Sequence, residues 1–408
     1  MKDNIIPTTN SILVSLYFLN VIVGSVSAIS SVVLLISIFY LALNYKLLKE
    51  VDFKILIWPA CMIIYGIYFA YIDFFFMGEY SNSIEKKLKF IGGGVFFIYL
   101  SISKINKKVF DIGVLLGGFV LILSVVYEGY VNSFIGRVGL GHNPIVLGWI
   151  MVVYSVCLFI ISFATKNSYL YLIVGFIVLL LSALTGTRGL YPIYLLIMCV
   201  LILIYVRNKK SHSEISIKYI ALIFLISFST LIVVKDPVVN RLNQTWSEYK
   251  KVEVGDLSSS IGQRVQMYNS AIYLAKNAPV LGHGPDLENI NNKLQNYLDE
   301  NNYRTDLMDN YSHFHNEYLN ALVSYGLIGL FLYLLILITP LYGLNGLARY
   351  MMISLMSVYV IGSLFDSPFY SNRSTSTFLF IVPVIMFYCL EYFKEDLSDG
   401  IDKNIREI

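Results

Sequence analysis

Polar residues gather in one short segment, SHFHNEYLN, which spans Ser312–Asn320 and directly precedes a long apolar run. A histidine here could act as a general base, because its ordinary pKa of about 6.5 lets it take a proton from a hydroxyl near neutral pH. His315 is our candidate for that base. The alternative is a histidine that only forms hydrogen bonds at an interface. His313 lies two residues earlier, so which of the two histidines would act stays open.

A metal site on these two histidines is not favoured by the sequence. Residues at i and i+2 do not share a helix face, and no third ligand follows at a spacing typical of metal sites. The four cysteines all fall inside apolar runs, again without metal-ligand spacing. We therefore expect no metal and no cofactor.

Two arginines could bind an anion. Arg188 lies in LTGTRG between two apolar runs, where a guanidinium is costly unless it is paired or reaches water. Arg264 lies at the start of a predicted helix, where a bound anion would meet both the guanidinium and free backbone N–H groups. Either could instead be solvated or interfacial. Together they would make a diphosphate site, because a planar guanidinium matches phosphate oxygens. Arg137, Arg241 and Arg373 are weaker candidates.

The elements that would position these residues are membrane helices. Hydrophobic residues make up 57% of the 408-residue chain and charged residues 14%, whereas a soluble domain carries about a quarter charged residues. Apolar runs of about 20 residues recur along the chain. We predict an all-α polytopic membrane protein, one domain over residues 1–408, with about twelve transmembrane helices and a retained first helix. The expected spans are a hairpin within 11–43 and helices near 54–76, 88–103, 109–127, 144–164, 168–186, 189–206, 217–234, 316–339, 346–366 and 375–393.

Basic residues set the predicted orientation. Loops around residues 46–54, 104–108 and 207–210 carry lysines and arginines and fall on one side, which the positive-inside rule assigns to the cytoplasm together with both termini. The segment 235–315, between the ninth and tenth spans, is then a periplasmic loop. It is too long to be structureless. QRVQMYNSAIYLAKNAP and DLENINNKLQNYLDENN have helical periodicity, and Ser258–Ser260 offer an N-cap.

Several classes of protein are not indicated. The sequence has no GxxxxGK[ST] phosphate loop, no GxGxxG after a strand and no HExxH pair, so neither a soluble nucleotide substrate nor a zinc protease is expected. The formal net charge of +3 is too small to indicate a nucleic acid partner.

Three motifs resemble one known family. TGTRG, IGQRVQMY and HFHNEYLNALVSYGLIG, in this order and on one predicted side, resemble the O-antigen ligase and polymerase family over residues of about 130 to 390. The resemblance is closest to the ligases. It implies a GT-C-like, metal-independent, inverting glycosyltransferase in the bacterial inner membrane. Such an enzyme moves a glycan from undecaprenyl diphosphate to lipid A–core oligosaccharide on the periplasmic face.

The resemblance also implies roles for individual residues. Arg188 and Arg264 would hold the donor diphosphate, and His315 would deprotonate the acceptor hydroxyl. Asp366 in LFDSPF and Arg373 in SNRSTS also match family positions, with lower priority.

Two other functions stay open. A polymerase would use the same chemistry but take another carrier-linked repeat unit as acceptor. The chain has a single long outward loop, which favours a ligase. A lipid-linked sugar transporter or flippase would be expected to show internal repeats or polar groups at mid-membrane. The sequence shows neither, because its distinctive polar residues gather on one outer side.

Overall fold

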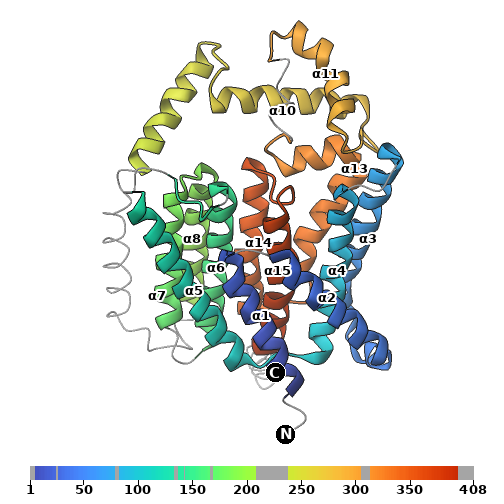
Figure 1. Ribbon diagram of the computed structural model, residues 1–408, viewed down its shortest axis with the longest axis vertical. Coiled ribbons are helices and arrows are strands. Elements are labelled where there is room, and N and C mark those ends of the chain that lie inside the picture. The colour runs from blue at the N-terminus through green and yellow to red at the C-terminus, as the bar shows by residue number, and fades with distance from the viewer. Residues whose placement is uncertain are drawn as a thin grey trace, which may run out of the picture.

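The computed structural model describes residues 5–23, 26–78, 82–132, 137–141, 143–165, 169–207, 238–304 and 313–393. Within these ranges every regular element is helical, as the sequence predicts (Figure 1). The α-helices are α1 (Ile5–Val23), α2 (Val26–Leu43), α3 (Phe53–Met77), α4 (Asn82–Ser103), α5 (Lys107–Val131), α6 (Pro144–Ala164), α7 (Tyr169–Leu181), α8 (Tyr191–Arg207), α10 (Ser260–Asn277), α11 (Leu287–Glu300), α13 (Glu317–Ile338), α14 (Gly346–Phe365) and α15 (Asn372–Tyr392). A further helix covers residues 238–253.

Apolar helices form the bundle. Six helices of the described chain are long and apolar enough to cross a membrane, and they extend over 53–77, 107–131, 144–164, 317–341, 346–365 and 372–392. Shorter apolar helices cover 32–43, 169–185 and 188–200. The expected span at 217–234 lies outside the described residues. A polytopic membrane protein is therefore supported, whereas the number of about twelve spans stays a prediction.

The centre of the bundle is formed by α6 and α15. Each has 89% of its most apolar segment buried, against 44% for α3 and α5. Helices that are apolar on all sides belong in such an interior, or they face lipid. Leu35, Phe39 and Leu123 lie on the outside with more than half of their surface exposed, as is suitable for contact with lipid tails.

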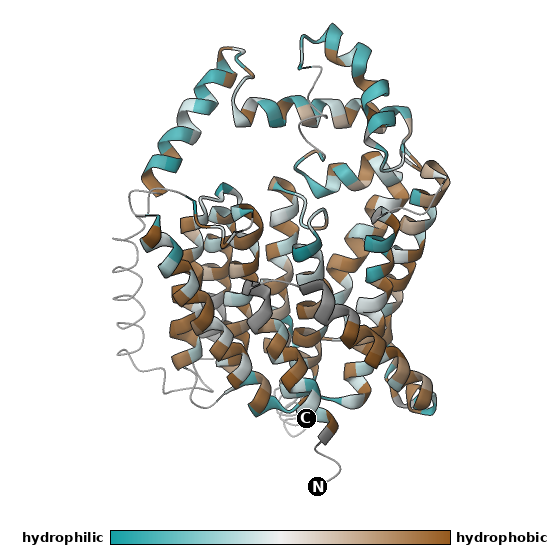
Figure 2. Ribbon diagram, in the orientation of Figure 1, coloured by the Kyte–Doolittle hydropathy of each residue, from teal (hydrophilic) through white to brown (hydrophobic). Residues whose placement is uncertain are grey.

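Polar helices cover one end of the bundle. Figure 2 shows hydrophobic residues along the bundle and hydrophilic residues concentrated on α10, α11 and the helix over 238–253. We call these three helices the cap. The two helices predicted within the long loop, α10 and α11, are confirmed, and the predicted N-cap is Ser259, whose side chain accepts a hydrogen bond from the Gly262 N–H.

A second hydrophobic cluster holds α10 and α11 together. It contains Met267, Ala271 and Leu274 from α10 and Ile290, Leu294 and Leu298 from α11. The cap is also anchored to α13, which breaks at Gly326 with φ 66° and ψ −166°. Backbone N–H groups just after the break cannot bond within the helix. The Leu327 N–H instead donates to the Pro279 carbonyl, in the chain that follows α10, at 2.8 Å.

The α4–α5 turn lies at the opposite end of the bundle from the cap (Figure 1). There the Asn106 N–H donates to the Pro7 carbonyl at 3.1 Å, and the Tyr392 hydroxyl donates to the Ile105 carbonyl at 2.9 Å. The start of α1 and the end of α15 therefore share this end with the basic turn.

Candidate active site

A cavity of about 180 Å³ lies between the bundle and the cap. Its walls come from the chain before α6, the first turns of α6, the α7–α8 turn, the helix over 238–253, the first two turns of α10, the residue before the N-cap of α13 and the end of α14. The charged and imidazole side chains that line it are Arg137, Arg188, Arg241, Arg264, His315 and Asp366. The three principal candidates from the sequence thus meet in one cavity. Arg373 is not among its lining residues.

The α7–α8 turn is built to bring a guanidinium to the cavity. After α7 the chain forms a 3-10 turn over Ser182–Thr185, and Gly186 then reverses it with φ 62°, a left-handed conformation that glycine adopts without strain. Arg188 follows in a second 3-10 turn before α8. A β-carbon on Gly186 would also lie 3.2 Å from the Arg137 Nε. Glycine is therefore suited to this position for two reasons.

Two further arginines support this turn. The Arg137 Nε donates to the Thr185 carbonyl at 2.7 Å, and the Arg241 Nε donates to the Gly186 carbonyl at 3.2 Å. Burial lowers the pKa of the Arg137 guanidinium, and the positive charges of Arg241 and Arg188 lower it further. Arg241 is a weak candidate by sequence, and the fold places it with the principal ones. Like charges brought together in this way favour binding of an anion.

Arg188 is paired in this structure. Its two terminal nitrogens donate to the two Glu248 carboxylate oxygens at 2.8 and 2.7 Å. Hydrogen bonding from Arg188 lowers the pKa of the Glu248 carboxyl, although burial opposes this shift. Glu248 lies on the helix over 238–253. The sequence analysis missed it, because nothing in WSEYKK links this glutamate to an arginine 60 residues earlier.

The α10 helix presents its N-terminal end to the cavity. It begins at Ser260, so Arg264 lies just beyond the first turn rather than at the start as expected. Ser260, Gln263 and Arg264 all line the cavity. The positive end of the helix dipole adds to the guanidinium charge there. The Tyr268 hydroxyl donates to the Leu364 carbonyl at 3.0 Å and lies 3.3 Å from the His315 carbonyl, which ties α10 to the histidine segment.

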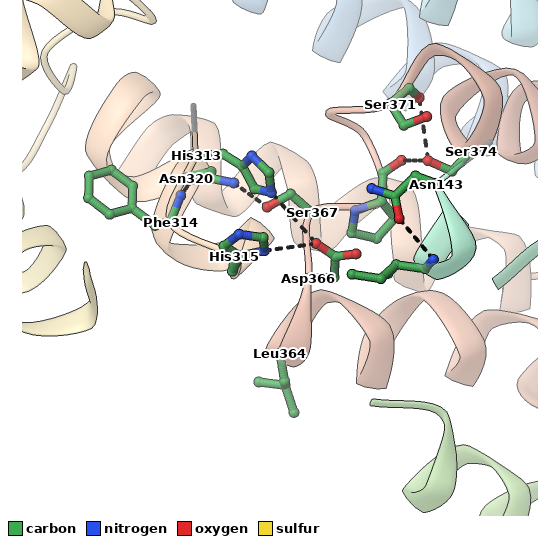
Figure 3. A network of polar contacts seen from close by, with 12 residues as sticks. Asn143, His313, Phe314, His315, Asn320, Leu364, Asp366, Ser367, Ser371 and Ser374 are labelled. Atoms are coloured by element: carbon green, nitrogen blue, oxygen red, sulfur yellow. Dashed lines mark hydrogen bonds and ion pairs between the residues drawn. The ribbon is translucent and has the colours of Figure 1, made fainter. Parts of the chain in front are cut away.

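His313 and His315 of the SHFHNEYLN segment both face the carboxylate of Asp366 (Figure 3). The His315 Nδ1 lies 3.3 Å and the His313 Nε2 3.6 Å from the Asp366 Oδ1. His315 has φ 49° and directly precedes Asn316, the N-cap of α13. Asn320 joins the two segments, because it accepts from the Phe314 N–H at 2.9 Å and donates to the Ser367 hydroxyl at 2.5 Å.

The carboxylate that the histidines share is ionised. Burial alone would raise the pKa of the Asp366 carboxyl, but hydrogen bonds from His313 and His315 outweigh burial and hold that pKa well below its usual range. An ionised Asp366 can accept the Nδ1–H of a neutral His315 ring, in which the lone pair then lies on Nε2.

The two histidines differ in position. His315 lines the cavity, whereas His313 is not among the lining residues. The His313 ring stacks on Tyr370 with centroids 4.4 Å apart, and burial lowers the pKa of His313 below its ordinary value. The sequence offered no third metal ligand beside the histidines. The fold supplies one from the end of α14, since ligand atoms of His313, His315 and Asp366 lie within 4.8 Å of one another.

The fold and the cavity together define a polytopic membrane protein with a cationic site at one end of its helix bundle. A family model described as O-antigen ligase matches residues 173–334, which include Arg188, Arg264 and His315. This match over residues 173–334 confirms the resemblance to the O-antigen ligase family that the motifs indicate.

Two curated relatives are similar over part of the chain. An O-antigen ligase of Escherichia coli strain K12 is 26% identical over 265 residues, which cover 60% of this chain and 58% of the relative. An uncharacterized protein of Haemophilus influenzae is 27% identical over 240 residues, 56% of each chain. The chain thus spans less than three fifths of the length of the relatives it matches.

Proposed function

We propose that the protein is an O-antigen ligase of the bacterial inner membrane. It transfers a glycan from undecaprenyl diphosphate to lipid A–core oligosaccharide on the periplasmic face, without a metal and with inversion at the anomeric carbon. The observation that carries this proposal is the cavity in which Arg188, Arg264 and the His315–Asp366 pair meet. The family match and the ligase name of one relative support it.

The arginines bind the donor and stabilise the leaving group. A diphosphate gains charge as its bond to the sugar breaks, so preorganised cations favour the transition state over the bound donor. Arg264 and the start of α10 offer a guanidinium and a positive helix end at the cavity wall. Arg188 engages phosphate oxygens in place of the Glu248 carboxylate, because both anions suit the same guanidinium nitrogens.

His315 activates the acceptor. Asp366 accepts the Nδ1–H of His315, and the Nε2 takes the proton of the acceptor hydroxyl. The hydroxyl oxygen then forms a bond to the anomeric carbon. The bond from that carbon to the phosphate oxygen breaks, and undecaprenyl diphosphate leaves with the electron pair. The proton stays on His315 until solvent takes it up.

A polymerase is the second candidate, since its donor and its chemistry would be the same. The cavity geometry does not depend on the acceptor. Transport is less well supported, because the charged groups described above lie at one end of the bundle rather than within it.

A complementation experiment tests the proposal. A strain lacking the gene is complemented with wild type, His315→Ala or Arg264→Ala, and its lipopolysaccharide and carrier-linked glycans are analysed in parallel. A ligase predicts long polymer on the carrier and bare core in the deletion strain, and both variants should reproduce this at normal membrane levels. Core with a single repeat unit would identify a polymerase. Normal lipopolysaccharide in the deletion strain would contradict both.

A further inference from the structure

Two histidines converge on a single carboxylate oxygen, although the proposed reaction needs only one of them. A base oriented by a carboxylate is complete with His315 and Asp366. His313 is placed against the same Asp366 Oδ1 from outside the cavity wall. Convergence of several ligand atoms on one point is what a metal ion requires.

We propose that His313, His315 and Asp366 form a binding site for Zn²⁺ that inhibits the enzyme. Two imidazoles and a carboxylate form a ligand set typical of zinc. Zinc binds such ligands at about 2.0–2.2 Å, which separates neighbouring ligand atoms of a tetrahedron by roughly 3.3–3.6 Å. The Asp366 Oδ1 lies 3.3 Å from the His315 Nδ1 and 3.6 Å from the His313 Nε2. An ion can therefore replace these hydrogen bonds with small side-chain shifts.

The ligands are held by a surrounding shell. The Asn320 side chain bonds both the Phe314 N–H and the Ser367 hydroxyl, so the two ligand-bearing segments keep their spacing. The His313 ring is fixed against Tyr370. Such outer contacts orient ligands and strengthen metal binding. His315 and Asp366 also line the cavity, so water can complete the coordination from that side.

Inhibition follows from the tautomer of His315. A neutral imidazole has one nitrogen with a hydrogen and one with a lone pair. When zinc occupies the Nδ1 lone pair, the hydrogen must lie on Nε2. That nitrogen then cannot accept the proton of the acceptor hydroxyl. This part of the inference rests on the proposed function, whereas zinc binding itself does not.

Arg188 and Arg264 line the same cavity as His315 and Asp366, and their positive charges oppose binding of a dication. We therefore expect a reversible site that fills when zinc is added, rather than one that carries zinc permanently.

The test compares wild type with His313→Gln and His283→Gln in the purified full-length protein. Glutamine at 313 keeps an N–H donor for Asp366 but is a poor zinc ligand. His283 is the matched control, because it is a buried histidine of the chain between α10 and α11 whose Nε2 lies 2.9 Å from the Leu274 carbonyl oxygen. Zinc binding is measured by competition with a chromogenic chelator, and glycan transfer is measured at rising Zn²⁺.

We expect wild type and His283→Gln to bind zinc with the same affinity. Both should lose glycan transfer as the site fills and regain it when a chelator removes the zinc. Measured against its own zinc-free transfer rate, His313→Gln should need at least about tenfold more zinc than wild type for the same fractional inhibition. Equal zinc affinity in His313→Gln and wild type would overturn the site. Loss of transfer on chelation would overturn the inhibitory role. If no protein transfers glycan, the proposed function fails, and the chelator titration still decides the site.

Discussion

At the residue scale, the site combines four arginines of the cavity wall with a histidine held by a partly buried carboxylate. Asp366 is the link between them, because its oxygen contacts both histidines while the side chain lines the arginine cavity. Its ionised state depends on hydrogen bonds that outweigh the effect of burial. Replacing Asp366 by an uncharged residue of the same shape should therefore disturb the orientation of His315 but leave donor binding intact.

Asp366→Asn is expected to lower kcat by about 10²-fold or more, because His315 loses the acceptor that fixes its tautomer. Donor affinity should change little, since the arginines are untouched. The check is transfer kinetics with purified protein, together with donor binding measured separately. A large loss of donor affinity with kcat unchanged would contradict this assignment.

Glu248→Gln tests the ion pair with Arg188. Because hydrogen bonding from Arg188 lowers the folded-state pKa of Glu248, the pair stabilises the protein above the unfolded pKa of about 4.3 and loses this effect as the pH falls through the folded pKa. The variant should unfold at lower temperature than wild type at pH 7. The difference should shrink below about pH 4.

The same variant should bind the donor more tightly, because a carboxylate no longer competes for Arg188. Thermal unfolding across pH and donor titration are the two measurements. A variant that is as stable as wild type at pH 7, or one that binds donor more weakly, would show that Glu248 does not act as a competitor.

At the scale of elements, the attachment of the cap decides the site. The α13 break places Gly326 against the chain that follows α10, and a β-carbon there would lie within 2.0 Å of the Val280 carbonyl oxygen. The α10 helix that carries Arg264 thus depends on a glycine in α13. Tyr268 makes a second connection, to the segments that carry His315 and Asp366.

Gly326→Ala is expected to detach the cap and abolish most transfer, while the bundle still inserts in the membrane. Gly346→Ala is the matched control. Gly346 also has a positive φ, of 53°, but its added β-carbon meets nothing within 4 Å. The control should suffer only the backbone cost of about 1–2 kcal/mol. Limited proteolysis of the α10–α11 region and transfer assays make the comparison. Equal behaviour of the two variants would contradict the role of Gly326 in anchoring the cap.

At the scale of the whole molecule, the two ends of the bundle are chemically different. One end has the cap and the cavity, and the other has the α4–α5 turn with Lys104, Lys107 and Lys108. The positive-inside rule places the lysine end in the cytoplasm. The cavity would then open to the periplasm, as the proposed function requires.

Cysteine labelling tests this orientation. Asn301→Cys lies at the exposed end of α11, and Lys108→Cys lies at the exposed start of α5. A membrane-impermeant thiol reagent should label the first in intact spheroplasts and the second only after permeabilisation. Wild type, with its four cysteines in apolar segments, is the background control. The reverse pattern would place the cavity on the cytoplasmic side and contradict the proposed function.

The sequence alone determined the class of the molecule and much of its local structure. Apolar runs require helices in a membrane, because backbone groups must be paired where water is absent. The helices α10 and α11 were predictable from periodicity and capping residues, which act within a few positions of one another. The sequence also predicted Arg188, Arg264 and His315 as site residues, through their types and surroundings, and their roles stay a proposal.

Only the tertiary structure decided which side chains meet. Glu248, Arg241 and the sharing of Asp366 by two histidines depend on contacts between segments 50 or more residues apart. No spacing along the chain encodes such contacts. They arise because α13, α14 and the cap pack at one end of the bundle, and burial there brings charges together that would be fully solvated in an isolated segment.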